Sequence, residues 1–442
     1  MHPVTDKKGV TLTLKPSTYR PRLLDALLDR RLEGFGAVEV AGTKFCGKTW
    51  TSMAHGQSII HIDEDAVRQM VLVDATLALS GDQPHIIDEW QDVPKIWDAV
   101  RRKVDSSGNQ RGQFILTGSS TVDKSKVFHS GAGRIAKMQM RPMSLFESGD
   151  SDGSISLNGL FEGEFKTQQV STDVRELARL VCLGGWPAGL DMNEKLLGDL
   201  PAQYLEALFS VSASKRNLDP DFARKTAVSL ARSIGKILTY KTLYKDVSET
   251  DPSERMDQSL FRQALDPYLR FFKDQYFIED LNGWDAPIKS RSRVRSKPKR
   301  AFADPSLPAA LLHQSPDRLL HEMQLFGNLF VELCLRDVRV YASAMQQLPE
   351  PSVYYYSDAD GLEVDIVIEL LDGRWGAFEV KLSEEKVPEA QKNLLRLRNK
   401  VTANPAAKNR EPSFLAVLVG KATFCRKTPE GIYVVPITSL TA

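Results

Sequence analysis

The chain has 442 residues, which at about 150 residues per domain predicts three domains. Hydrophobic residues make up 42% of the sequence and charged residues 26%, a composition that fits a globular protein and excludes a collagen, a coiled coil and a wholly disordered chain. The 58 Lys and Arg residues nearly balance the 57 Asp and Glu residues, leaving a formal net charge of +1. Any contact with nucleic acid must therefore come from a local basic patch.

The start of the chain and its cysteines indicate a cytoplasmic protein. Residues 1–8 are polar, and no apolar run reaches the roughly 18 residues that a membrane span needs. Cys46, Cys182, Cys334 and Cys425 lie far apart and form no CxxC pair. We therefore expect reduced thiols, no zinc site and no contact with a membrane.

From about residue 15 to residue 150, short apolar runs alternate with helical stretches, which is typical of βαβ units around a largely parallel sheet. Polar or glycine-containing turns follow the apolar runs, at the strand ends where open α/β sheets bind ligands. A stretch rich in Ser, Asp and Gly over 150–163 predicts a linker, so we place the first domain boundary near residue 150. The predicted strands are 36–41, 59–62, 85–87 and 113–116.

The rest of the sequence predicts two further domains, over 151–305 and 306–442. Residues 172–290 have helical periodicity, and 258–281 fits a helix, a short helix and an extended wing. The last block begins with a helix over 319–338. Its predicted strands are 353–356, 363–370, 375–382 and 414–419.

The segment Gly42–Thr49 reads GTKFCGKT and fits GxxxxGK[ST], directly after a predicted strand and before a helical run. In such a loop, successive backbone N–H groups face an anion, and a lysine, here Lys48, reaches the β- and γ-phosphates. Thr49 would ligate Mg²⁺, so the loop predicts binding of ATP with magnesium. The expected nucleotide-contacting residues are Gly42, Thr43, Lys44, Phe45, Cys46, Gly47, Lys48, Thr49 and Trp50.

A second element of the same site follows the strand 85–87, which ends in Asp88 and Glu89. Asp88 would hold magnesium through water, and Glu89 is placed to polarise the attacking water. This carboxylate favours hydrolysis of ATP over binding alone. The alternative is an acidic pair that stabilises the dipole of a following helix.

Further groups could act on the γ-phosphate. Thr117 and Ser119 follow the strand 113–116 and could sense the phosphate, although ordinary turn chemistry explains them equally well. Arg134 follows the flexible Gly131–Gly133 segment and could act as an arginine finger in trans, which requires a homo-oligomer. Arg141 is a weaker alternative, and a solvated surface arginine is the other interpretation.

A carboxylate and lysine constellation lies in the last block. Glu379 and Lys381 are two residues apart and face the same side of one strand. A three-residue loop over 371–373 would place Asp365 opposite Glu379, whereas a two-residue loop would put them on opposite faces. Together they would bind Mg²⁺ beside a lysine and cut a phosphodiester, or they form a solvated edge with a Glu–Lys pair. Glu332, on the preceding predicted helix, could be a fourth polar member, but we favour its interpretation as a solvated helix residue.

Basic residues cluster between these two candidate sites. The run from Lys289 to Arg300 holds seven basic residues among twelve and no acid. Such a run could follow the phosphate backbone of DNA or RNA, particularly beside a winged helix, or it could be a solvated loop.

Taken together, these motifs resemble those of bacterial and archaeal AAA-type P-loop ATPases with a C-terminal domain of unknown function. The resemblance implies an α/β ATPase domain over 1–150, a helical and winged-helix-like domain over 151–305, and an α/β domain over 306–442 similar to the restriction-endonuclease core. Asp365, Glu379 and Lys381 occupy its PD-(D/E)xK positions, although Glu363-Val364 precedes Asp365 where Pro-Asp is sought. Segments that carry the resemblance are 19–21, 42–49, 87–91, 116–120, 133–134, 141–147, 184–187, 299–304, 327–332, 363–365 and 379–381.

Three functions remain open on the sequence. The first is an ATP-hydrolysing motor or switch coupled to nucleic acid. The second is a Mg²⁺-dependent nuclease that ATP gates. The third is a non-enzymatic scaffold that binds phosphate backbones.

Overall fold

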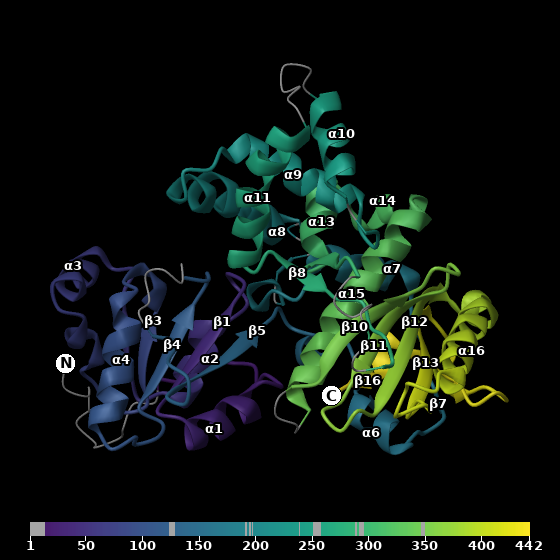
Figure 1. Cartoon of the computed structure of the whole chain (residues 1–442), viewed down its shortest axis with the longest axis horizontal. Helices are drawn as coiled ribbons and strands as arrows, with labels where there is room; N and C mark the ends of the chain where they lie inside the picture. Colours follow the sequence, from purple (N-terminus) through teal and green to yellow (C-terminus); the bar gives the residue numbers. More distant parts are fainter. Residues whose placement is uncertain are drawn as a thin grey trace. The chain divides into compact units, whose positions relative to one another are not determined.

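The computed structural model describes residues 14–122, 129–190, 192–193, 196, 198–237, 239–250, 258–287, 290, 296–345 and 350–442 (Figure 1). The chain forms two compact units. The first comprises Met1–Arg141 together with Asp274–Tyr276, and the second comprises Pro142–Lys273 and Phe277–Ala442.

A five-stranded parallel sheet forms the centre of the first unit, with the strand order β2-β3-β4-β1-β5. All four predicted strands are present. The sequence did not predict β5, because Lys137 and Gln139 interrupt its apolar run; Lys137 is exposed on this edge strand. The strands are β1 (Ala37–Gly42), β2 (Ser58–His61), β3 (His85–Asp88), β4 (Phe114–Gly118) and β5 (Ile135–Met140).

Helices cover both faces of this sheet. On one face, Ile86 and Ile115 pack in a core with apolar residues of α1 (Asp25–Gly34). On the other face, Ile87 and Leu116 pack with residues of α3 (Asp65–Val73) and α4 (Lys95–Ser106). Strands covered on both faces must be apolar at nearly every position, which explains the short continuous runs in the sequence. The helix α2 (Lys48–His55) follows β1, as the motif requires.

The second unit contains a helical segment and an antiparallel strand pair. In the part of 172–290 that the structure describes, the predicted helical periodicity corresponds to five α-helices, and the β8–β9 pair follows them. The elements are α7 (Val174–Leu183), α8 (Asp199–Glu206), α9 (Pro220–Arg232), α10 (Tyr240–Thr250), α11 (Gln258–Asp274), β8 (Ile278–Leu281) and β9 (Lys299–Phe302).

A mixed sheet of order β10-β11-β12-β13-β15-β14-β7 follows the helices α13 (Ser306–Leu311), α14 (Pro316–His321) and α15 (Met323–Ala344). The helix α16 (Val387–Ala403) joins β12 to β13, and the crossover makes these two strands parallel. Its apolar residues pack against the sheet. The strands are β7 (Gln168–Gln169), β10 (Ser352–Ser357), β11 (Glu363–Glu369), β12 (Trp375–Ser383), β13 (Phe414–Lys421), β14 (Phe424–Lys427) and β15 (Tyr433–Pro436).

The prediction of a linker over 150–163 was wrong. Residues Ile155–Ser156 form β6, which pairs with β16 (Leu440–Thr441), and Leu157–Glu162 form α6. The side chains of Ile155, Leu157, Leu160 and Phe161 are buried. Ser156 caps the start of α6, and Gly163 follows its last residue. The Ser and Gly residues therefore begin and end a short helix here, and the four apolar side chains pack it into the core.

Other observations concern the cysteines and the helices. All four cysteines are unpaired and buried. Within the described ranges, no helix has both the length and the apolar character needed to cross a bilayer.

Candidate functional site

The phosphate loop lies where β1 ends and α2 begins, at the carboxyl edge of the parallel sheet. Gly42 pairs with Met140 of β5, and a Cβ on Gly42 would lie 2.0 Å from the Met140 carbonyl oxygen. Gly47 precedes α2 with a φ of 100°, in the left-handed region that favours glycine. Glycine is therefore required at position 42 by the close approach of β5 and at position 47 by the positive φ.

The side chains of Lys48 and Thr49 are held by polar contacts at this edge. The Lys48 ammonium is buried and donates a hydrogen bond of 2.9 Å to the Thr43 carbonyl oxygen. The Thr49 hydroxyl, in the first turn of α2, donates at 3.0 Å to Oδ1 of Asp88, the last residue of β3. The structure thus brings together the two groups that the sequence assigned to magnesium.

The remaining loop residues differ in exposure. Cys46 is buried, with its Sγ 3.6 Å from the Met140 carbonyl oxygen. Phe45 is 55% exposed at a φ of 64°, and Trp50 is 47% exposed.

Asp88 is the centre of a polar cluster at the ends of three neighbouring strands. It accepts hydrogen bonds from Thr49 and from the Thr117 hydroxyl. Nδ1 of His61, the last residue of β2, lies 3.2 Å from Asp88 Oδ2. The sequence analysis missed His61, although its position at the end of the neighbouring parallel strand was a usable signal.

Glu89 has a φ of 54° and follows β3 directly. Its Oε2 accepts a hydrogen bond of 2.8 Å from the Ser119 hydroxyl and another from the Gln91 amide. Its side chain does not cap the three-residue turn Trp90–Asp92 that follows. Thr117 and Ser119 therefore contact the two acidic residues that the sequence placed in the site.

These residues fit a magnesium–nucleotide complex. Mg²⁺ is commonly held by one or two protein oxygens together with phosphate oxygens and water. Thr49 and Asp88 supply such a pair, and Lys48 supplies a positive charge in the same loop. Over the described ranges, no group of three or more His, Cys, Asp or Glu side chains is arranged to hold a metal without such additional ligands.

The two candidate arginine fingers lie at opposite ends of β5. The Arg134 carbonyl accepts from the Ala37 N–H at the start of β1, so Arg134 lies at the edge of the sheet away from the loop. A six-residue strand separates these edges by about 20 Å. The Arg134 guanidinium donates to Oδ1 of Asp105 at 2.7 Å. Within one chain, Arg141, directly after β5, is at the edge that carries the loop.

The second candidate site depends on the turn between β11 and β12. The Leu370 N–H donates to the Arg374 carbonyl at 2.8 Å, and Gly373 has a φ of 84°, so the loop has three residues. Ile366 pairs with Phe378. The register hypothesis that sets Asp365 opposite Glu379 is confirmed.

Three side chains surround the Glu379 carboxylate. Lys381 Nζ lies 3.1 Å from Oε2, and the amide of Asn393 on α16 donates to Oε1 at 3.1 Å. Asp365 on the facing strand accepts from the Val380 N–H at 2.9 Å. The sequence analysis did not single out Asn393, because it did not predict the helix that carries this residue.

Burial and neighbouring charges shift the pKa values of the acidic and basic groups in this site. Burial, and then the charge of Asp365, raise the pKa of Glu379 to about 8. Burial alone would lower the pKa of Lys381, but Glu379 and Asp365 hold it above its usual value. One lysine thus faces two carboxylates, and a divalent cation would stabilise both carboxylates in the charged form.

Comparison with known proteins matches three stretches of the chain to family models. Residues 35–148, which include the phosphate loop, Asp88 and Glu89, match the family model of an AAA domain. This stretch thus carries an AAA-type P-loop domain. Residues 174–318 and 326–440 match two models of domains of unknown function, DUF8612 and DUF4143. No curated protein matches the sequence of the chain.

Several solved structures are similar to the chain at low identity. A Walker-type ATPase of Pyrococcus abyssi is 12% identical, with 68% of this chain and 98% of that chain covered and a TM-score of 0.44. The Orc1 protein of Aeropyrum pernix in complex with DNA is 13% identical, with 70% and 97% covered and a TM-score of 0.26. The Hef helicase domain of Pyrococcus furiosus is 11% identical, with 87% and 80% covered and a TM-score of 0.20.

Glu332 lies outside the AAA domain and is not the solvated residue that we expected. It is buried on α15, and its carboxylate accepts from the Phe302 N–H at 2.9 Å. Burial raises its pKa to about 7. The periodicity of α15 did not reveal this burial, because nearly all faces of the helix are covered in its middle part.

The basic run beyond the AAA domain falls largely outside the described residues, which include only Ser290 and residues 296–300 of it. Within that part, Lys299 is not a solvated residue. Its ammonium forms an ion pair with Glu363 and lies 4.8 Å from the ring centroid of Tyr355. Lys299 is thus buried and paired within the chain, and contact between the basic run and nucleic acid stays a prediction.

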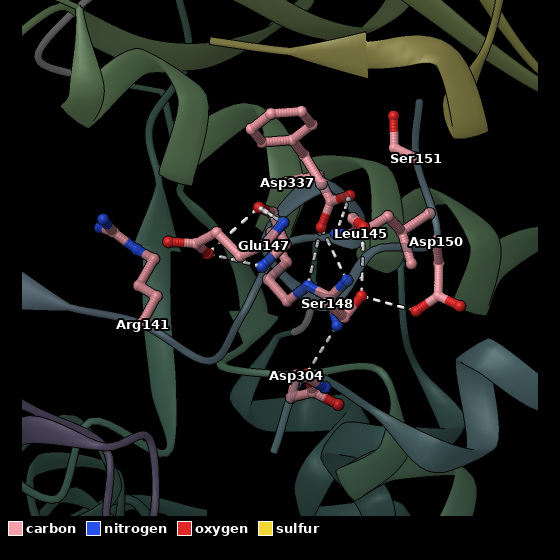
Figure 2. A network of polar contacts seen from close by, with 12 residues as sticks. Arg141, Leu145, Glu147, Ser148, Asp150, Ser151, Asp304 and Asp337 are labelled. Atoms are coloured by element: carbon pink, nitrogen blue, oxygen red, sulfur yellow. Dashed lines mark hydrogen bonds and ion pairs between the residues drawn. The ribbon is translucent and has the colours of Figure 1, made fainter. Parts of the chain in front are cut away.

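Several motif segments meet in a buried network of the second unit instead of at a catalytic site. Arg336 on α15 donates to Asp304 and to Asp337, each at 2.9 Å, and all three side chains are buried. The Leu145 N–H donates to Asp337 at 3.0 Å (Figure 2). The Gly185 N–H donates to Asp304 at 2.9 Å. These segments are therefore explained by packing of the second unit.

Proposed function

We propose that the AAA domain hydrolyses ATP in the presence of Mg²⁺. The observation that carries this proposal is the contact of 3.0 Å between the Thr49 hydroxyl and Asp88, beside Glu89. Bound magnesium would neutralise charge on the phosphates, held by Thr49 and, through water, by Asp88. A domain that only stored nucleotide would not need the second carboxylate.

Each residue has a distinct role in this proposal. Lys48 exchanges its contact with the Thr43 carbonyl for the β- and γ-phosphates. Glu89 accepts a proton from the attacking water, while Ser119 and Gln91 hold its carboxylate in place. Thr117 orients Asp88.

The substitution Asp88→Asn tests this arrangement. It keeps the size of the side chain but removes the charge, so the gain in ATP affinity that Mg²⁺ provides and the turnover should both be lost. Asp82→Asn is the control, because Asp82 is an exposed carboxylate in the turn before the same strand. Turnover in Asp88→Asn at the level of Asp82→Asn would contradict the proposal.

A second candidate function is metal-dependent cleavage of DNA or RNA by Asp365, Glu379 and Lys381. The facing carboxylates and the raised pKa of Glu379 support it. The order α15, three antiparallel strands, α16 and the parallel strand β13 supports the restriction-endonuclease-like core that the resemblance of the sequence implies. Lys381 would lie beside the nucleophilic water, with the metal held by the two carboxylates.

Incubation of plasmid or oligonucleotide with Mg²⁺ or Mn²⁺ tests the nuclease. Cleavage by the wild type should be lost in Lys381→Ala and kept in Lys421→Ala, which removes an exposed lysine from the neighbouring strand. Salt-dependent binding without cleavage would support a scaffold instead. Stimulation of ATP turnover by the same nucleic acids would support coupling through the β8–β9 pair and the basic run.

A further inference from the structure

A buried arginine outside every motif contacts the phosphate loop. Arg22 precedes α1 and is 6% exposed. Its Nη1 donates to the carbonyl oxygen of Cys46 at 2.8 Å, and its Nη2 donates to the carbonyl oxygen of Arg141 at 2.9 Å. One planar guanidinium therefore joins the loop after β1 to the residue after β5.

The contact with Cys46 fixes the direction of one peptide unit in the loop. The Cys46 carbonyl and the Gly47 N–H belong to the same trans peptide and point in opposite directions. Because Arg22 holds the oxygen, the Gly47 N–H is turned away from Arg22. A phosphate loop binds its anion through such N–H groups, and a carbonyl turned toward the phosphates would repel them.

This peptide needs an external contact to keep its direction. Gly47 has a φ of 100°, and glycine adopts positive and negative φ about equally readily, so the loop sequence alone does not prevent the peptide from turning over. Arg22 is itself held, because its backbone N–H donates to Asp25 Oδ2 on α1 at 3.0 Å.

We propose that Arg22 is a positioning residue for phosphate binding, which locks the Cys46–Gly47 peptide with its carbonyl directed away from the bound phosphates. The inference rests on nucleotide binding by the AAA domain as proposed above. It assigns a role in the phosphate site to a residue that lies 20 positions before Gly42, the first residue of the motif.

Titration of the full chain with ATP and with inorganic tripolyphosphate tests the proposal. The titrations are done without Mg²⁺, so that no turnover occurs, and well below the unfolding temperature of each variant. We expect Arg22→Ala to lose at least tenfold in affinity for both probes, because the effect acts on the phosphates. Arg22→Lys, which can reach one carbonyl, should lose less. Arg111→Ala is the control, because Arg111 also donates to a backbone carbonyl, that of Glu33, away from the loop.

The possible results separate this inference from the proposed function. A folded Arg22→Ala protein with a lowered unfolding temperature and wild-type affinity for both probes would overturn the inference alone. If this variant does not fold, Arg22→Met, which keeps an extended side chain but cannot donate a hydrogen bond, takes its place, and wild-type affinity of Arg22→Met overturns the inference. Loss of ATP affinity with unchanged tripolyphosphate affinity would also contradict it. A wild type that binds neither probe would overturn the inference, and a wild type that also binds no ATP in the presence of Mg²⁺ would overturn the proposed function with it.

Discussion

Gly42 is the residue at which β1 ends and the phosphate loop begins, and any side chain there would strike the neighbouring strand. A Cβ would lie 2.0 Å from the Met140 carbonyl oxygen, and the φ of 154° is unfavourable for other residues. We expect Gly42→Ala to lower the free energy of unfolding by about 2–4 kcal/mol and to abolish nucleotide binding, because β5 must move. Chemical denaturation and nucleotide titration measure the two effects.

The control for this prediction is Gly34→Ala. Gly34 ends α1, and an added Cβ would meet nothing within 4 Å. Alanine should therefore be neutral or raise the free energy of unfolding by up to about 1 kcal/mol. Equal destabilisation by the two substitutions would show that the contact with Met140 is not the cause.

At the residue scale, the sequence predicted the groups that a local motif specifies. Lys48 and Thr49 follow from the loop pattern, and Asp88 follows from its position after an apolar strand. Arg22 and Asn393 could not be predicted in this way, because they reach their partners through contacts between residues far apart in the sequence.

At the element scale, α15 carries a buried glutamate that should make stability depend on pH. Burial raises the pKa of Glu332 from 4.5 to about 7. The Glu332 carboxylate therefore binds a proton more tightly in the folded protein than in the unfolded chain. The resulting stabilisation is complete below pH 4.5 and is lost as the pH rises to about 7. We expect this loss to reach about 3 kcal/mol.

Urea denaturation between pH 4.5 and 8 measures this effect. Glu332→Gln cannot ionise but can still accept from the Phe302 N–H, so its free energy of unfolding should fall less with pH than that of the wild type. Glu322→Gln, at an exposed position before the same helix, should behave as the wild type. The same pH dependence in Glu332→Gln and the wild type would be inconsistent with a raised pKa.

Elements were predicted best where one sequence pattern determines both structure and burial. The hairpin β11–β12 follows from alternation and an Asp-Gly turn, and its three-residue loop was one of two registers that the sequence allowed. The strand β5 and the segment 155–162 were missed, since polar residues interrupt short apolar runs there. The secondary structure of such segments is decided by their packing in the folded chain.

At the scale of the whole molecule, the position of Arg134 predicts that any role in hydrolysis requires a second chain. Arg134 and Arg101 both pair with Asp105, at the edge of the sheet away from the phosphate loop. If Arg134 acts in trans, Arg134→Ala should abolish turnover and leave ATP binding unchanged. Arg101→Ala should leave both turnover and ATP binding unchanged. Parallel loss of binding and turnover in Arg134→Ala, or equal effects of the two substitutions, would exclude the trans role.

The most direct test of the proposed ATPase compares steady-state ATP hydrolysis by the wild type and Glu89→Gln, with bound nucleotide measured in the same samples. We expect Mg²⁺-dependent turnover by the wild type. Glu89→Gln should bind ATP with similar affinity and hydrolyse it at least about a hundredfold more slowly, because general-base catalysis contributes about 10²–10⁴ in rate. Absence of turnover by the wild type, or equal turnover by both proteins, would contradict the account.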